Sequence, residues 1–418
     1  MSVDKMVPEI RFKGFSRDWD KNKLLNYSSK IGDGLHGTPT YTENTGVYFI
    51  NGNNLVSGHI AITNDTKQVS RGEQSKTDVS LDLNTILLSI NGTIGNLAWY
   101  EGQDVMLGKS VAFITLENCD NTYMYSYLQT ERVKNYFSNS LTGSTIKNLG
   151  LKAIRESIIL IPDERAEQTA IGNTFQKLDN LIKQHQQKHD KLSNIKKAML
   201  EKMFPKQGKT IHEIRFKGFS GEWEEIKFSE IFNEKDGIRR GPFGGSIKKE
   251  MFVSKSDYVV YEQRNAIYDR YDTRYNISKE KYQELINFSL ASGDFIMSGA
   301  GTIGRVSRVP DDVKRGVFNQ AIIRMKINDE RVDSEFFLQW IRSEKMQERL
   351  TESNPASAMV NLVPMSELKA WDVVVPKKDE QIVIGSYFQK LDELINQHQQ
   401  QITKLNNIKQ ACLSKMFV

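Results

Sequence analysis

The segment TFQKLDNLIKQHQQKHDKLSNIKKAMLEKMF occupies residues 174–204, and YFQKLDELINQHQQQITKLNNIKQACLSKMF occupies residues 387–417. The two segments agree at 21 of 31 positions, at an offset of 213 residues. Neither contains Gly or Pro, and both are rich in Lys, Gln and Leu, which are good helix formers. Each segment therefore predicts one long helix, and 1.5 Å per residue gives it a length of roughly 46 Å.

Apolar residues recur at spacings of three and four along both segments, which places them in a stripe on one side of each helix. The residues expected in this stripe are Phe175, Leu178, Ile182, Leu192, Ile195 and Met199 in the first helix, and Phe388, Leu391, Ile395, Leu405, Ile408 and Cys412 in the second. A lone helix would expose its stripe to water. We therefore expect the two helices to form an antiparallel coiled coil with pseudo-twofold symmetry between the halves, since each buried apolar side chain contributes about 1.5–3 kcal/mol before entropy costs.

The repeat extends beyond the helices. Residues 9–19 read EIRFKGFSRDW and residues 213–223 read EIRFKGFSGEW, so the chain divides into halves at about 9–204 and 213–417. Between these ends each half repeats an order of elements: a strand reaching GTIG, a second strand, an amphipathic helix, and a strand that ends in Pro. The corresponding segments are 86–95, 111–116, 123–128 and 157–162 in the first half, and 295–304, 321–327, 336–341 and 372–376 in the second. The predicted class is α+β, with a mixed domain before each long helix.

Composition narrows the function without deciding it. The 418 residues include 57 Lys and Arg against 52 Asp and Glu, a formal charge of +5 that permits nucleic-acid binding but does not require it. No apolar run approaches the roughly 20 residues of a membrane helix, and the first residues lack the apolar core of a signal peptide. Two cysteines cannot form a disulfide framework, so a cytoplasmic location is expected.

A repeated frame with unlike inserts suggests a repeated partner and two different targets. Two similar helices can dock two copies of one protein, and two unlike domains can read two unlike things. On duplex DNA, two readers on one face would lie near multiples of a helical turn, about 34–36 Å. The expected target is then two short, unlike DNA sequences separated by base pairs that are not read.

The second insert is the more basic one. The Arg and Lys residues of DGIRRGPFGGSIKKE (236–250) and YEQRNAIYDRYDTRY (261–275) are expected to form one basic cluster interleaved with Tyr. Arg can contact guanine edges or phosphates, and Gln can pair with adenine. The candidate DNA-binding residues are Arg239, Arg240, Lys248, Lys249, Gln263, Arg264, Arg270 and Arg274. For any single residue, an ordinary solvated loop is an equally good interpretation.

The first insert contains DGLHGTPTY (33–41) and FINGNNL (49–55). Glycine-rich loops allow close backbone approach, and Asn can read adenine. The candidates are His36, Thr38, Tyr41, Asn51 and Asn53, with Lys109 and Lys147 as phosphate contacts or plain surface lysines.

Several motifs suggest catalysis but lack the context for it. GAGTIG (299–304) matches a dinucleotide-binding pattern, yet RVSRVPDD follows where a helix is required, so a strand-to-strand turn is favoured. GKS (108–110) runs into an expected strand rather than a helix. His185 and His189 could seat a metal, but the second copy has Ile402 in place of the second His. No site residues are assigned to catalysis or to a metal.

Taken together, the doubled EIRFKGF leaders, GTIG turns and FQKLD…HQQ…MF helices resemble the specificity subunit of type I restriction-modification enzymes. The resemblance covers nearly the whole chain. It implies target-recognition domains at 1–162 and 209–376, and spacer helices at 163–208 and 377–418. It also implies a non-catalytic subunit that places two adenine-N6 methyltransferase subunits and two restriction/translocase subunits on a split asymmetric site in double-stranded DNA.

The same resemblance implies that the chain binds no cofactor itself, while the partner subunits use S-adenosylmethionine, ATP and Mg²⁺. Two other interpretations remain open. One is a coiled-coil adaptor whose globular domains bind protein rather than DNA, and the other is an enzyme such as a nuclease.

Overall fold

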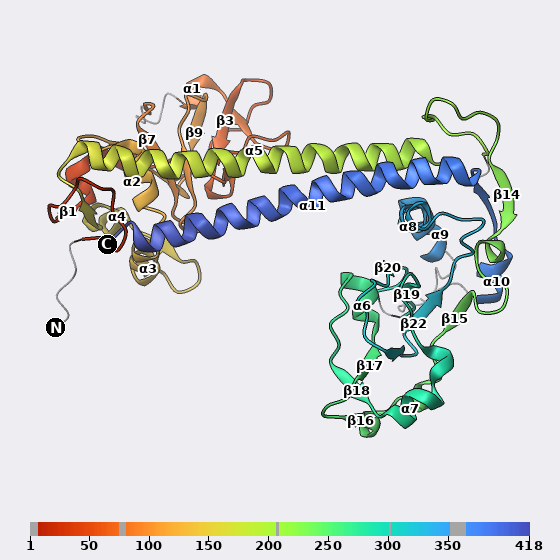
Figure 1. Ribbon diagram of the computed structural model, residues 1–418. Coiled ribbons are helices and arrows are strands. Elements are labelled where there is room, and N and C mark those ends of the chain that lie inside the picture. Colours follow the sequence, from red (N-terminus) through yellow and green to blue (C-terminus); the bar gives the residue numbers. More distant parts are fainter. Residues whose placement is uncertain (1–6, 75–80, 206–208, 301, 352–364) are drawn as a thin grey trace. The chain divides into compact units, whose positions relative to one another are not determined.

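The computed structural model describes residues 7–74, 81–205, 209–300, 302–351 and 365–418 (Figure 1). The chain separates into two compact units: unit 1 comprises residues 1–186 and 399–418, and unit 2 comprises residues 187–398. Two long helices, α5 (Arg165–Met203) and α11 (Lys378–Lys415), contribute residues to both units. Unit 1 is therefore built from two separate stretches of sequence.

Unit 1 contains a four-stranded antiparallel sheet in the order β2 (Ser28–Asp33), β10 (Val111–Leu116), β7 (Thr85–Ser89) and β8 (Leu97–Trp99). A second sheet has the order β6 (Gln68–Val69), β3 (Val47–Ile50), β9 (Val105–Leu107), and its strands β3 and β9 are parallel. The pairs β1 (Asp20–Lys23) with β13 (Ile158–Ile161), β4 (Leu55–Val56) with β5 (His59–Ile60), and β11 (Leu141–Thr142) with β12 (Asn148–Leu149) complete the strands of this unit. Its short helices are α1 (Arg71–Gln74), α2 (Asn121–Tyr127), α3 (Glu131–Asn139) and α4 (Leu151–Glu156).

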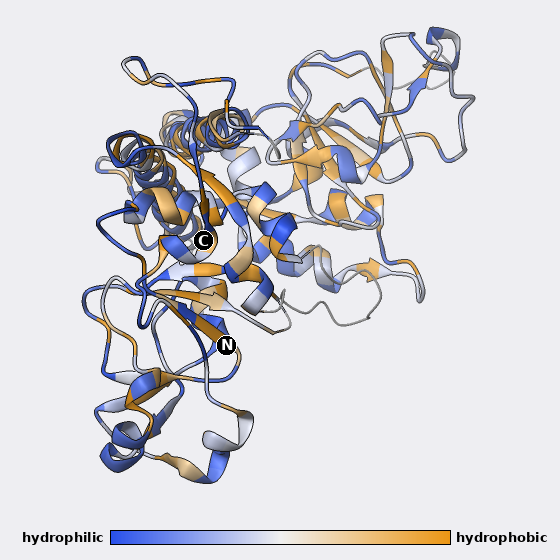
Figure 2. Cartoon of the chain, turned by 90° about the vertical axis from the view of Figure 1, so that its right-hand side faces the viewer, coloured by the Kyte–Doolittle hydropathy of each residue, from blue (hydrophilic) through white to orange (hydrophobic). Residues whose placement is uncertain are grey.

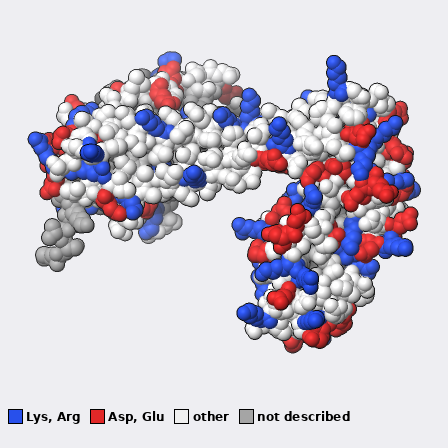
Figure 3. Space-filling model, viewed as in Figure 1, with Lys and Arg blue, Asp and Glu red and all other residues white. Residues whose placement is uncertain are grey.

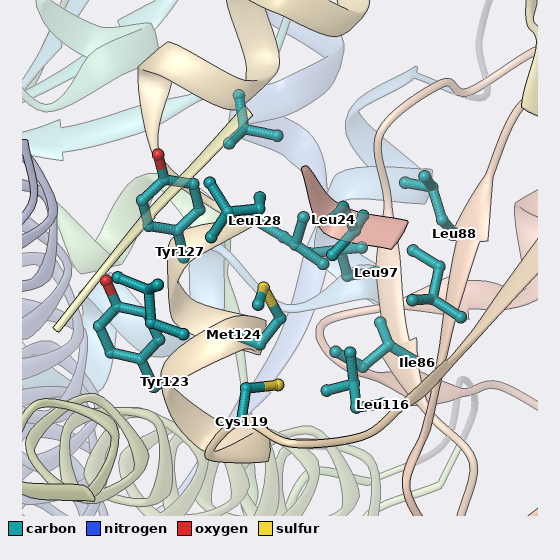
Figure 4. Close-up of a cluster of buried hydrophobic side chains, with 14 of the residues drawn as sticks. Leu24, Ile86, Leu88, Leu97, Leu116, Cys119, Tyr123, Met124, Tyr127 and Leu128 are labelled. Carbon is teal, nitrogen blue, oxygen red and sulfur yellow. The ribbon is translucent and has the colours of Figure 1, made fainter. Parts of the chain in front are cut away.

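Strand β10 is apolar on both faces because both faces are covered. Its residues Ala112 and Ile114 join the larger core of unit 1, whereas Val111 and Phe113 join a second core on the other face. Successive side chains of a strand point to opposite faces, so a nearly continuous apolar run such as VAFITL, interrupted only by Thr115, marks a strand buried on both sides. The larger core packs against α2 (Figure 4).

Unit 2 repeats this topology. Its four-stranded sheet has the order β15 (Ile238–Arg240), β22 (Ile322–Met325), β19 (Phe295–Ser298), β20 (Val306–Arg308). Its second sheet has the order β16 (Phe252–Val253), β18 (Tyr275–Ile277), β17 (Tyr258–Tyr261), β21 (Gly316–Phe318), with β17 and β21 parallel. Strands β14 (Glu224–Lys227) and β23 (Asp372–Val375) pair as β1 and β13 do. The helices are α6 (Gln263–Tyr268), α7 (Lys279–Glu284), α8 (Ser334–Ile341), α9 (Glu344–Thr351) and α10 (Met365–Ala370).

The strands and amphipathic helices expected from the sequence are present. The four apolar residues that predict each amphipathic helix lie on α2 and at its C-terminal end, or on α8, and all are buried. In Figure 2 the strands are predominantly hydrophobic, while much of the connecting backbone is hydrophilic. The long helices begin earlier than the repeated segments, at Arg165 and Lys378 rather than at Thr174 and Tyr387.

Within each unit the two long helices run in opposite directions. In unit 1 the Phe175 ring of α5 stacks on that of Phe417, which follows α11, with centroids 5.4 Å apart, and Lys409 lies 2.6 Å from Asp179. The numbering thus rises along one helix as it falls along the other. In unit 2 Phe204 stacks on Phe388 at 6.2 Å, and Lys196 lies 2.6 Å from Asp392.

Most residues of the predicted apolar stripe are buried or half-buried, and the prediction of burial is wrong at one position. Phe175, Phe388 and Leu391 are buried, and Leu178, Leu192, Ile195, Met199 and Cys412 are partly buried against the cores. Ile182, Ile395 and Leu405 are half-buried. Ile408, however, is 39% exposed, because it lies at the edge of the face that Ile402, Leu413 and Met416 turn inward.

The repeated leader fastens to the long helices of its unit. Arg11 donates two hydrogen bonds to the buried Glu167 of α5, at 2.7 and 2.8 Å, and the amide of Ile10 donates to the carbonyl of Lys415 at the end of α11. The buried Trp19 ring meets Phe417 edge-on at 6.3 Å. One leader thereby ties the start of one helix to the end of the other.

Unit 2 contains the same attachment. Arg215 donates to the buried Glu380 of α11 at 2.8 and 2.6 Å, and the amide of Ile214 donates to Lys202 near the end of α5. Trp223 meets Phe204 edge-on at 6.0 Å. The leader sequence is repeated because each unit needs the same attachment.

Candidate nucleic-acid interface

Four connections of unit 1 meet at one edge of its sheets. Strand β2 ends beside the start of β10, and β7 ends at Ser89, which pairs with Val111. The parallel strands β3 and β9 also end together, since Ile50 pairs with Leu107. The connections that leave these strand ends comprise residues 34–38, 51–54, 90–95 and 108–110, which we call loop edge 1.

Hydrogen bonds hold the members of loop edge 1 together. The amide of Gly34 donates to the Val111 carbonyl at 3.1 Å, and that of Ile90 donates to the Ser110 carbonyl at 2.9 Å. The amide of Gly52 donates to the Ser110 hydroxyl at 2.9 Å. Segments separated by more than 70 residues in sequence therefore form one surface.

Most candidates of the first insert lie on or beside this edge. His36, Thr38, Asn53 and Lys109 are exposed on its loops. Lys147 is exposed next to it, because residues 91 and 148 form a β-bridge. The structure thus gathers residues that the sequence distributes over more than 100 positions.

Two other candidates of the first insert have positions that the sequence did not reveal. The side-chain oxygen of Asn51 accepts a hydrogen bond from the Ser110 hydroxyl at 3.1 Å, so this half-buried residue shapes the loop. Tyr41 bridges to Val69 and packs edge-on against Phe49, with centroids 5.9 Å apart. Tyr41 therefore lies beside the second sheet rather than on loop edge 1.

Unit 2 has a matching loop edge 2, which comprises residues 241–245, 262–268, 299–304 and 319–321, with Gly301 outside the described residues. The amide of Gly241 donates to the Ile322 carbonyl at 2.9 Å, and that of Gly299 donates to Ala321 at 2.8 Å. The amide of Asn319 donates to Tyr261, the last residue of β17, at 3.0 Å. The strands that position this edge correspond one by one to those of unit 1.

The connections from β7 to β8 and from β19 to β20 contain matching hydrogen bonds among their described residues. The Ser89 hydroxyl donates to the Thr93 carbonyl and accepts from the Asn96 amide at 2.8 Å. The Ser298 hydroxyl donates to Thr302 at 2.5 Å and accepts from the Arg305 amide at 3.1 Å. Each turn joins two antiparallel strands, which confirms the prediction against a dinucleotide-binding loop.

Arg239 belongs to a network of charges on neighbouring strands, β15 and β22, of the four-stranded sheet of unit 2. Its Nε donates to Asp236 at 3.0 Å, and the buried Arg324 and half-buried Lys326 also pair with Asp236. Burial raises the pKa of Asp236, but hydrogen bonds from Lys326 and Arg239 together with the positive charges of Arg324 and Lys326 outweigh burial, so the pKa lies below its usual value. The guanidinium of Arg239 is therefore already paired within the protein.

The candidates near α6 lie at loop edge 2, and two of them are paired. Arg264 lies 2.9 Å from Asp272, and Arg274 makes two hydrogen bonds to Glu262, at 2.9 and 2.7 Å. Gln263 is half-buried on the first turn of α6.

Arg240 and Arg270 are exposed, and within the described part of the chain neither has an ion pair or a side-chain hydrogen bond. Among the predicted basic residues, these two cations are therefore available at loop edge 2.

The basic residues expected to form one cluster are divided in space. Lys248 and Lys249 are exposed just before β16, whose Phe252 pairs with Ile277. Ile277 also pairs with Tyr258 at the start of β17, whereas loop edge 2 follows the end of that strand. The prediction of one contiguous cluster was wrong, because a strand of the sheet separates its members. Figure 3 accordingly shows basic and acidic side chains interspersed on the face of unit 2 in view.

Helix α11 carries a shallow hollow on its exposed side. The hollow has a volume of about 550 Å³ and is lined by Gln399, Gln400, Thr403, Lys404, Asn407, Ile408 and Ala411. All these residues belong to unit 1. The exposed Ile408 is thus part of an open surface rather than of the packed stripe.

The described residues contain neither a candidate metal site nor a candidate membrane helix. No three His, Cys, Asp or Glu side chains among them are arranged to hold a metal ion. None of the helices in the described ranges combines the length and apolar character needed to cross a membrane.

Comparison with known proteins places the chain among DNA-specificity proteins. The model of the family "Type I restriction modification DNA specificity domain" matches residues 37–194 and 220–407. A protein of Methanocaldococcus jannaschii assigned as the MjaX specificity subunit of a type I restriction enzyme is 22% identical over 335 residues, which cover 78% of this chain and 74% of the relative.

Solved structures agree in fold. The superposition on the S subunit of a type I restriction-modification system from M. genitalium covers 99% of each chain, with a TM-score of 0.60 at 16% sequence identity. A chain from a study of complex assembly and conformational transition in a type I system gives a TM-score of 0.51 at 13% identity, covering 96% of this chain and 97% of that one. At these identities the likeness concerns the fold.

Proposed function

Because the chain belongs to the family of type I restriction-modification specificity subunits, we propose that each of its units reads one short sequence of a bipartite, asymmetric DNA site. One observation carries this proposal: the same connections converge at an edge of the sheets in both units, yet they present different side chains. Matching frames with unlike loops suit the reading of two unlike half-sites by one protein.

The exposed groups of the loop edges have suitable chemistry. Lys109 and Lys147 can neutralise phosphates, and Asn53 can pair with the edge of adenine. Arg240 and Arg270 can contact guanine or phosphate. Phosphate contacts would fix the position on the duplex, and base contacts would supply the sequence preference.

We also propose the domain organisation that the sequence suggested. Residues 1–162 and 209–376 would be target-recognition domains, and 163–208 and 377–418 would form an antiparallel coiled coil that sets the spacing of the half-sites. The matched attachments Arg11–Glu167 and Arg215–Glu380 support an internal duplication. The opposite course of the helices within each unit supports the coiled coil.

The partners would be two methyltransferase and two restriction/translocase subunits, which would supply the chemistry with S-adenosylmethionine, ATP and Mg²⁺. The chain itself would bind none of these cofactors and would remain non-catalytic. The hollow on α11 around Ile408 supports docking of a partner on the long helices.

The proposal is tested with the complex that the full-length chain forms in its host, purified through a tag on this chain. Fluorescence anisotropy would measure its binding to duplexes selected from a random pool across a salt series. Each neutralised phosphate contributes about 0.9 to the slope of log affinity against log salt. Lys109→Ala and Lys147→Ala should each lower that slope by about 1, whereas Asn53→Ala should weaken binding at an unchanged slope.

Lys177→Ala provides the matched control, because this exposed lysine lies on α5 and belongs to none of the connections of loop edge 1. Failure of the complex to bind any duplex would overturn the proposal and favour a protein-binding adaptor. Equal slope changes for Lys109→Ala and Lys177→Ala would remove loop edge 1 from the DNA interface.

A further inference from the structure

The loops that follow β2 and β15 occupy corresponding positions and differ at their tips. The first glycine of each loop lies against the backbone of the connection that leads into the neighbouring strand, β10 in unit 1 and β22 in unit 2. A Cβ on Gly34 would lie 2.1 Å from the Leu107 carbonyl oxygen, and one on Gly241 would lie 1.9 Å from that of Asn319. These close approaches fix where each loop leaves its sheet. In unit 2, the residue two positions after this glycine is Phe243.

The corresponding residue of unit 1 is His36. Its Nε2 lies 2.8 Å from a carboxylate oxygen of Asp33, so the imidazole is bound to its own loop. Phe243 has no polar group to hold it in this way. The two units thus present different rings at matching positions.

The loop of unit 2 directs the Phe243 ring into solvent. Pro242 is buried, and the amide of Ser246 donates to the Phe243 carbonyl at 2.8 Å, so the backbone is fastened on both sides of the tip. The ring is 93% exposed, more than any other large hydrophobic side chain in the described ranges. Folding therefore gains almost nothing from this ring, since apolar side chains stabilise a fold by leaving water.

The surroundings of the ring favour nucleic acid over protein as its partner. Phe243 belongs to none of the apolar clusters of the described residues, and Gly244 and Gly245 follow it, whereas protein-binding surfaces are contiguous apolar patches. Arg240, three residues earlier, is exposed and carries no ion pair to any described residue. An apolar ring beside a free cation matches duplex DNA, where phosphates lie outside and base faces lie within reach of a wedge.

We propose that Phe243 is a wedge that unit 2 inserts at one base step of its half-site, unstacking the two bases and stacking on one of them. This inference rests on the proposed function and adds a specific contact to it. Unit 1 presents His36 at the matching position, so the distortion of the DNA is confined to the half-site of unit 2. The step that unstacks most easily would then contribute to sequence preference without a hydrogen bond.

The test uses the tagged full-length complex and a short duplex that it selects from a random pool, with 2-aminopurine placed at successive positions. The fluorescence of 2-aminopurine rises when the base unstacks. The wild-type complex should raise it several-fold at one step of one half-site. Phe243→Ala should abolish this rise and weaken binding roughly tenfold, because stacking of one base on an aromatic side chain has an effect of that order.

Ile286→Ala is the matched control, because it removes an exposed apolar side chain that belongs to none of the connections of loop edge 2. It should leave both signals unchanged. Tight binding by the wild type with no fluorescence rise at any position, or equal affinity of Phe243→Ala and wild type, would overturn the wedge and leave the proposed function standing. Absence of any selected duplex would instead overturn the proposed function, and the wedge with it.

Discussion

Replacing Arg11 by Leu should destabilise unit 1 strongly, because Arg11 pairs with a buried carboxylate. Arg11 donates two hydrogen bonds to Glu167, whose side chain is only 1% exposed. The substitution would leave a carboxylate buried without its counter-charge, which typically costs about 3–5 kcal/mol. For a unit of this size, that cost corresponds to a fall in the unfolding temperature on the order of 10 °C.

The chain supplies a control of the same chemistry. Arg17 lies 3.4 Å from Asp163, but their side chains are 70% and 63% exposed. Exposed pairs contribute roughly 0–1 kcal/mol, so Arg17→Leu should shift the transition by no more than a few degrees. In addition, Arg11→Leu combined with Glu167→Leu should recover much of the loss, because no unpaired charge remains in the core.

Differential scanning calorimetry combined with hydrogen exchange would assign each transition to a unit. Arg11→Leu should loosen unit 1, and the equivalent Arg215→Leu should loosen unit 2. The reasoning is refuted if Arg11→Leu costs no more than Arg17→Leu, or if both leader substitutions affect the same unit.

Three further predictions concern other parts of the frame. Burial, and next the nearby Arg215, lower the pKa of His212, so the unfolded chain binds the proton more tightly than the folded chain does. The stability of unit 2 should therefore fall as the pH drops below 6.5, the ordinary pKa of His. In His212→Phe, the unfolding temperature should fall less over the same pH range. Gly241→Ala should weaken binding to duplex DNA by displacing loop edge 2, while Gly245→Ala, whose Cβ would meet nothing within 4 Å, should bind as the wild type does. Phe417→Ala should lower the free energy of urea unfolding of unit 1 by about 3–5 kcal/mol, because it removes an aromatic ring from the core and leaves a cavity. A decrease no larger than that caused by Val418→Ala would contradict this packing.

Much of the frame could be predicted from sequence because it is repeated and strongly patterned. A strand such as 111–116 is apolar at every position except Thr115, and the long helices have regular apolar spacing. The repeat alone places the starts of the helices at Thr174 and Tyr387, because the two copies diverge before these residues, although both helices already run there. Ile408 was misplaced because a stripe with spacings of three and four does not define which of its edges is covered.

The candidate interface was less predictable because it depends on which strand ends meet. The sequence could indicate that Lys109 and Asn53 were suitable for DNA, but only the pairing of β3 with β9 brings them to one edge. Charge alone also grouped Arg239 with Arg240, whereas alternation along β15 lets Arg239 pair with Asp236 and leaves Arg240 exposed. Comparison of GLHG with GPFG in the two copies was the signal that could have identified Phe243.

The central claim is that each loop edge reads one half of a split DNA site, and mapping of methylated adenines in the host tests it most directly. The motif would be determined for the wild type, for Asn53→Ala with Lys109→Ala, and for Arg240→Ala with Arg270→Ala. We predict that the first pair of changes relaxes only one half of the motif and the second pair only the other half. Relaxation of both halves by either pair, or a single undivided motif, would contradict the account.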